Sequence, residues 1–161
     1  MRVSIALIVL VLDQASKLAV SNWVQVGESR PILGNLVRLT YIHNAGAVFG
    51  LTFGGRALHL VLSLVALGLV VSMLARTPAE ESRARAGLSL ILGGAVGNLI
   101  DRLRVGEVID FLDVGIGSTR WYIFNVADSA VTIGVLALLA SYLFQRSPHL
   151  GGTEPRGSGP D

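Results

Sequence analysis

The 161-residue chain contains no cysteine, which excludes disulfide bonds, thiolate metal sites and a cysteine nucleophile. Charged residues are also scarce, at 15% of the chain, and they sum to only +2 with no block of one sign. Such a chain lacks the basic patches that bind nucleic acid. The histidines, His43, His59 and His149, do not have the spacing of a metal-binding motif. We therefore expect no metal, no cofactor and no nucleic-acid partner.

Apolar residues, in contrast, make up 52% of the chain, a share that is typical of membrane proteins. Four segments are apolar over about 20 residues, the length that a helix needs to cross a bilayer. They run approximately from Val3 to Trp23, Ala57 to Ala75, Ala86 to Leu103 and Asn125 to Phe144. The sequence predicts an all-α membrane protein with four transmembrane helices.

The first apolar segment also resembles a cleaved signal peptide, because Arg2 precedes it. Asp13 and Lys17 interrupt the run where a signal peptide stays apolar, so we expect a retained helix. Four spans place both termini on one side of the membrane. Six arginines fall on each side, so the basic residues alone do not fix the orientation, but the shorter connections of the terminal side favour that side as cytoplasmic.

The two connections on the opposite side are long and rich in β-branched and aromatic residues. Residues 36–42 and 119–124 predict short strands, which would form a small extracytoplasmic β-rich region from the first and third loops. We expect one four-span membrane domain over residues 1–146, including the extracytoplasmic loops 24–56 and 104–124. Residues 147–161 are Gly, Pro and polar residues and predict a disordered cytoplasmic tail.

Several polar residues interrupt the first and third spans at one end of the predicted helices. Asp13 and Lys17 are four residues apart and can pair, although each charge costs about 2.5 to 3.5 kcal/mol at the bilayer centre. They either pin one helix to another or face a substrate. In the third span a single helical face carries Gly94, Asn98, Asp101 and Arg102. A simpler interpretation of this face is that Arg102 extends its side chain to the membrane–water interface and pairs with the neighbouring carboxylate of Asp101.

Two further carboxylates flank the start of the fourth span. Asp128 follows Asn125 by three residues, a pattern that is typical of a helix cap. Asp110 lies in the apolar run from Val108 to Leu112, where it is either an exposed loop acid or an acid buried on a strand. Two carboxylates near one membrane surface can share a proton and hydrolyse a peptide bond with water. A serine nucleophile is not favoured, because Ser129 has no histidine or lysine base near it in the sequence.

Five short segments carry these residues in order along the chain. They are Asp13-Gln14-Ala15-Ser16-Lys17, Asn44-Ala45-Gly46-Ala47-Val48-Phe49-Gly50, Gly97-Asn98-Leu99-Ile100-Asp101-Arg102, Val108-Ile109-Asp110-Phe111 and Phe124-Asn125-Val126-Ala127-Asp128. On a four-span chain of this length they resemble the motifs of lipoprotein signal peptidase, the bacterial signal peptidase II. That family consists of membrane aspartic peptidases that cut prolipoproteins on the N-terminal side of a cysteine carrying diacylglycerol.

The resemblance implies an aspartic endopeptidase whose catalytic pair is Asp110 and Asp128, and not Asp101. It implies that substrate is bound by Asn44, Gly94, Asn98, Asp101, Arg102 and Asn125. Asp13 and Lys17 would support the site. The expected partners are lipidated prolipoprotein signal peptides and membrane lipids, and the expected state is a monomer. The resemblance also implies that the protein is located in the bacterial inner membrane, with both termini in the cytoplasm and the active site near the extracytoplasmic face.

Two other functional classes fit the same residues. A small proton or ion carrier would also place Asp, Asn and Arg within membrane helices, and its transport would depend on Asp13 or Asp101. A non-catalytic membrane scaffold would tolerate the replacement of Asp110 with only an effect on stability.

Overall fold

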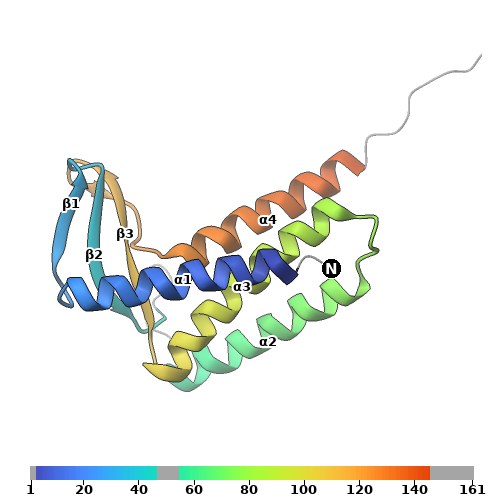
Figure 1. Cartoon of the computed structure of the whole chain (residues 1–161), viewed down its shortest axis with the longest axis horizontal. Helices are drawn as coiled ribbons and strands as arrows, with labels where there is room; N and C mark the ends of the chain where they lie inside the picture. The colour runs from blue at the N-terminus through green and yellow to red at the C-terminus, as the bar shows by residue number, and fades with distance from the viewer. Residues whose placement is uncertain (1–2, 47–54, 146–161) are drawn as a thin grey trace, which may run out of the picture.

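The computed structural model describes residues 3–46 and 55–145, and within them the chain forms four long helices with a small antiparallel sheet across one end (Figure 1). The helices are α1 (Val3–Trp23), α2 (Gly55–Arg76), α3 (Ser82–Arg104) and α4 (Val126–Gln145). Each is long and apolar enough to cross a membrane. The four predicted helices are confirmed, and α1 has the bounds that the sequence predicts. The tail over residues 147–161 lies outside the described residues.

The sheet has the strand order β1-β2-β3-β4. Its strands are β1 (Ser29–Leu33), β2 (Val37–Asn44), β3 (Val108–Ile116) and β4 (Thr119–Arg120). The prediction for residues 119–124 was too long, because only two of these residues form a strand and Phe124 adds a single bridge to Leu112. The chain has to leave the sheet there in order to begin α4.

Glycines on two sides of α3 let it pack closely against its neighbours, and α3 contacts each of the other three helices. A Cβ atom at Gly87 would lie 2.8 Å from the carbonyl oxygen of Gly134 on α4, and one at Gly93 would lie 2.7 Å from that of Ala6 on α1. Only glycine permits so close an approach of two backbones. The polar face of α3 is thereby held directly against α1 and α4.

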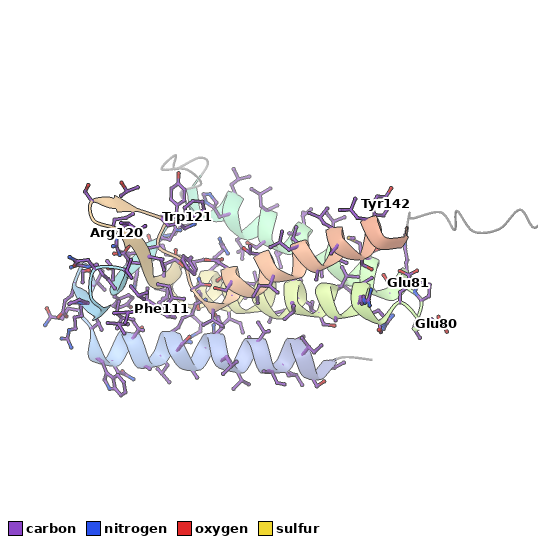
Figure 2. All side chains as sticks on the ribbon, turned by 90° about the horizontal axis from the view of Figure 1, so that it is seen from above. Glu80, Glu81, Phe111, Arg120, Trp121 and Tyr142 are labelled. Carbon is purple, nitrogen blue, oxygen red and sulfur yellow. The ribbon has the colours of Figure 1, made fainter. Side chains whose placement is uncertain are left out.

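The outer surface of the helices is apolar, as a bilayer requires. No residue of α2 is buried, and its exposed side chains include Leu62, Val65 and Leu69. α1 likewise exposes Ile8 and Val11. Figure 2 shows Glu80, Glu81 and Tyr142 at the end of the bundle opposite the sheet.

A small apolar core fixes the sheet to the end of α1. It consists of Val20, Val24, Tyr41 and Phe111, each at most 6% exposed. Figure 2 shows Phe111 near α1, on the side of β3 that faces this helix. This anchoring matters for the site, because β3 carries Asp110 directly before Phe111.

Candidate active site

A cluster of buried polar side chains lies where α1, α3, β3 and the start of α4 meet. Asp13, Lys17, Asp101, Asp110 and Asn125 are each at most 2% exposed. Among the described residues, no buried side-chain nitrogen or oxygen lacks a hydrogen-bond partner. Burying polar groups costs free energy unless each has a hydrogen-bond partner. Because every buried polar atom here has one, the cluster is a defined part of the folded structure.

Lys17 binds two carboxylates at the centre of this cluster. Its Nζ lies 2.8 Å from Oδ2 of Asp13 and 2.6 Å from Oδ2 of Asp101. The predicted pairing of Asp13 with Lys17 is therefore confirmed, and the structure adds Asp101 as the partner from α3. Gln14 completes the cluster by donating to both carboxylates, at 3.1 Å to Asp13 and 3.2 Å to Asp101. The sequence interpretation missed Gln14, although it lies inside the first motif.

Asn98 connects Lys17 to Asp128. Its Oδ1 accepts hydrogen bonds from Lys17 Nζ at 3.0 Å and from Asn125 Nδ2 at 3.1 Å, and its Nδ2 donates to Asp128 Oδ1 at 2.7 Å. An ammonium group can only donate, so Lys17 fixes which end of the Asn98 amide faces it. The amide nitrogen is consequently directed at the carboxylate of Asp128.

Asp128 caps α4 and also belongs to the polar cluster. Its backbone N–H donates to Asn125 Oδ1 at 2.8 Å, and its Oδ2 accepts from the backbone N–H of Asn125 at 3.3 Å. This reciprocal pair confirms the predicted cap. The carboxylate is only half-buried, and it lines a groove of about 400 Å³ together with Trp121, Phe124 and Ile133.

Asp110 is 1% exposed on β3, so the alternative of an exposed loop acid is wrong. Each of its oxygens accepts an amide hydrogen bond, Oδ1 from Asn125 at 2.7 Å and Oδ2 from Asn44 at 2.9 Å. Burial raises the pKa of Asp110 to about 7, and the negative charge of Asp128 adds to this effect. The two amide hydrogen bonds and the charge of Lys17 act in the opposite direction.

The two carboxylates do not hydrogen-bond to each other among the described contacts. They are joined instead through the amides of Asn125 and Asn98, each of which donates to one of them at 2.7 Å. Arg102 is half-buried nearby, and its positive charge interacts with Asp128, Asp110 and Asp101. The arrangement therefore pairs one enclosed carboxyl group with one that opens onto a groove, beside a cation.

The other residues named from the sequence fall into two groups. Asn44 lies at the edge of the site, because β2 and β3 pair with Asn44 opposite Val108 and Ile42 opposite Asp110. Gly94 instead lies in the packing of α3 against α4, where a side chain would overlap the carbonyl oxygen of Ala127. Substrate binding by Gly94 stays a prediction. The part of the chain that the structure describes has no group of three or more metal-ligating side chains.

The model of the family described as "Signal peptidase (SPase) II" matches residues 5–144. The chain belongs to this family. It is 42% identical over 141 residues to the lipoprotein signal peptidase of Syntrophus aciditrophicus (strain SB), covering 84% of this chain and 88% of that protein. It is 46% identical over 134 residues to that of Geobacter sulfurreducens (strain ATCC 51573 / DSM 12127 / PCA), covering 81% and 83%.

A solved structure, described as a bacterial membrane enzyme determined by the in meso method at 2.3 Å resolution, has the same fold. Its TM-score is 0.81 at 29% identity, and the match covers 97% of this chain and 92% of that chain. A second such structure, at 1.9 Å resolution, has a TM-score of 0.79 at 30% identity and covers 89% and 92%. The resemblance read from the five motifs is thus confirmed, and the chain is a protease of the bacterial membrane. The family does not support the carrier alternative.

Proposed function

We propose that this signal peptidase II family member cleaves diacylglyceryl-modified prolipoproteins on the N-terminal side of the lipidated cysteine, with Asp110 and Asp128 as its catalytic pair. The observation that carries this proposal is the hydrogen-bonded path between the two carboxylates. It runs from Asp110 to Asn125 at 2.7 Å, to Asn98 at 3.1 Å and to Asp128 at 2.7 Å. Such a path holds two carboxyl groups in a fixed geometry and in different environments, as acid and base catalysis needs.

The different environments of the two aspartates suggest their roles. Asp110 is enclosed, and its raised pKa keeps a proton available near neutral pH, so it would hydrogen-bond the scissile carbonyl oxygen and supply the proton of the leaving amine. Asp128 opens onto the groove, so it would polarise the attacking water. Asp128 takes a proton from the water as the water oxygen bonds to the carbonyl carbon, and the C–N bond breaks as Asp110 gives its proton to the amine.

The surrounding polar residues would bind the substrate and hold the pair in place. Arg102 and Asn44, at the edge of the cluster, would hold the peptide backbone or the lipid head group, with Asn98 and Asn125 orienting the aspartates. Asp13, Lys17 and Asp101 form an ion cluster whose contacts lie within the protein, so we assign them a supporting role. For Asn98, Asp101 and Asn125 these roles differ from the substrate contacts that the resemblance implies.

The placement in the membrane follows from the same proposal. The sheet would lie on the extracytoplasmic surface, and both termini would be cytoplasmic. A prolipoprotein, itself anchored by a hydrophobic segment, would then reach the site laterally from the bilayer. Residues 1–146 would act as one unit, and a single chain carries all the residues assigned to the site, which supports a monomer.

A gel-shift cleavage assay tests the catalytic pair. Purified protein in detergent would be given one synthetic prolipoprotein, with or without diacylglycerol on its cysteine, together with the variants Asp110→Asn and Asp128→Asn. We expect cleavage of the lipidated form only, and its loss in both variants. Glu80→Gln is the control, because Glu80 is exposed at the end of the bundle opposite the sheet and should leave cleavage unchanged. Cleavage that persists in either site variant would refute the assignment.

A further inference from the structure

Two apolar grooves share the side chains Trp121 and Phe124, and the first of them reaches Asp128. The first, of about 400 Å³, is lined by Trp121, Phe124, Asp128, Ser129, Thr132 and Ile133. The second, of about 620 Å³, lies at the end of the sheet, where Leu36, Val114 and Ile116 join the same Trp121 and Phe124. The pair forms a continuous surface that begins at a proposed catalytic aspartate. Figure 2 shows Trp121 and Arg120 at this sheet end of the molecule.

Three polar side chains along these grooves are engaged in hydrogen bonds, and a fourth, the exposed Thr119, lines the second groove. Ser129 Oγ donates to the carbonyl oxygen of Asn125 at 2.9 Å, and Thr132 Oγ1 donates to that of Asp128 at 2.9 Å. Arg120 pairs with Asp113 at 2.8 Å and also donates to the carbonyl oxygen of Asn35. Away from the carboxylate of Asp128 and the hydroxyl of Thr119, the walls are therefore mainly apolar, and a ligand that fits them is mainly a hydrocarbon.

We propose that these two grooves bind the acyl chains of the diacylglyceryl group on the substrate. The proposal rests on the proposed function, since it takes Asp128 to lie at the scissile bond. The lipid is attached to the residue directly after that bond, so its chains must leave the site close to this aspartate. The nearest apolar path runs along Trp121 and Phe124, and Ile133 extends it along α4 into the membrane span.

The proposal predicts that Trp121 contacts the acyl chains of the bound substrate. Trp121 is 71% exposed, and its ring makes an edge contact with that of Tyr122, which leaves most of the indole open to a bound chain. The chain has one other tryptophan, Trp23, which is 76% exposed at the end of α1 and lines neither groove. This pair offers a matched comparison, because any general effect of an exposed tryptophan on detergent or lipid binding would be seen at both positions.

Fluorescence quenching tests acyl binding without requiring turnover. Two proteins with a single tryptophan, Trp23→Phe and Trp121→Phe, would be prepared with Asp128→Asn to prevent cleavage. Each is titrated with a lipidated prolipoprotein peptide whose acyl chains carry bromine, which quenches a tryptophan that it contacts. We expect saturable quenching of Trp121 at peptide concentrations that leave Trp23 unaffected. Equal quenching of both, or quenching of Trp121 by brominated membrane lipid alone to the same extent, would overturn the proposal.

A kinetic series separates this proposal from the proposed function. Substrates with long and short acyl chains are compared in the wild type, Trp121→Ala, Ile133→Ser and the control Trp23→Ala. We expect the groove variants to raise KM for the long-chain substrate by about tenfold with little change in kcat, because fewer methylenes are then buried. Cleavage with an unchanged chain-length preference in both groove variants would reject the acyl grooves alone. Cleavage that survives Asp128→Asn would instead reject the catalytic assignment.

Discussion

Asp13 on α1 accepts a hydrogen bond from the backbone N–H of Ala127 in the first turn of α4, at 2.9 Å. The first N–H groups of a helix have no partner within the helix, so this carboxylate satisfies one of them from a different span. Its other oxygen pairs with Lys17 at 2.8 Å. Because Asp128 follows Ala127 directly, α1 fixes the position of a proposed catalytic residue that it does not touch.

Removal of this carboxylate should destabilise the whole bundle. Asp13→Ala leaves the Lys17 charge short of a buried partner and the backbone N–H of Ala127 without this acceptor, and breaking a buried pair costs about 3 to 5 kcal/mol. We expect a clear fall in Tm by circular dichroism in detergent, together with loss of cleavage. Glu28→Gln is the control, because it breaks an exposed ion pair with Arg30 and should leave Tm nearly unchanged. Equal Tm values for the two variants would contradict the role of Asp13.

Substitutions at Asn125 should separate its cap from its contact with Asp110. Serine is also a good N-cap, whereas alanine is not, and loss of a cap costs about 1 kcal/mol. We expect both Asn125→Ala and Asn125→Ser to lower Tm and kcat, because each removes the amide that donates to Asn98 and Asp110, but Asn125→Ser should lower Tm less because it keeps the cap. Serine is too short to donate to Asp110, so its kcat should still fall about 100-fold. Full activity of Asn125→Ser would show that the amide contact is dispensable.

The close packing of α3 against α4 makes a second stability prediction. A methyl group at Gly94 would overlap the backbone of Ala127, so Gly94→Ala should cost about 1 to 3 kcal/mol through overpacking and should shift Asp128. The matched control is Gly68→Ala on α2, where an added Cβ meets nothing within 4 Å. Unfolding of both variants would be followed side by side with cleavage. A normal Tm and activity for Gly94→Ala would mean that the helices separate at no cost.

The raised pKa of Asp110 predicts how stability depends on pH. In the unfolded chain this group titrates near its ordinary value of 3.8, whereas in the folded protein burial moves its pKa to about 7. The folded protein then holds the extra proton between these values, so the stability contributed by Asp110 is complete at low pH and is lost as the pH rises toward 7. Asp110→Asn should flatten this dependence in unfolding measurements between about pH 4 and 8. Parallel curves for the variant and the wild type would contradict the shift.

The raised pKa of Asp110 also predicts how kcat depends on pH. If Asp110 supplies the proton, kcat should fall as the pH rises through about 7. Steady-state rates across this range on the lipidated substrate measure it. Rates that stay flat through neutral pH would assign the proton to another group.

The helices could be predicted from the sequence because their signal is local. An apolar run of about 20 residues has few alternatives in a bilayer, and α1 ends where that run ends at Trp23. The capping pair of Asn125 and Asp128 is likewise local, and the structure confirms it. The pairing of Asp13 with Lys17 was readable for the same reason, since the two residues lie one helical turn apart.

The contacts that join distant segments could not be read from spacing alone. Lys17 and Asp101 meet because glycines bring α3 against α1, and no local pattern encodes that approach. β1 was missed, since its sequence from Ser29 to Leu33 includes Pro31 and lacks a clear alternation. The role of Asp110 depended on the register of β2 with β3, which brings Asn44 beside it. The family motifs named these residues as a group without giving their contacts.

The buried position of Lys17 has a consequence for biogenesis. During synthesis α1 emerges before the other three described helices, and Asn98, which accepts a hydrogen bond from Lys17, follows 81 residues later. The backbone that Asp13 caps follows after 114 residues. Until those segments are made, Asp13 and Lys17 have only their mutual ion pair to offset the free-energy cost of placing their charges in the bilayer. The burial of α1's charges is thus incomplete when this helix enters the membrane, and α4, which is made after the other three described helices, completes both the bundle and the site.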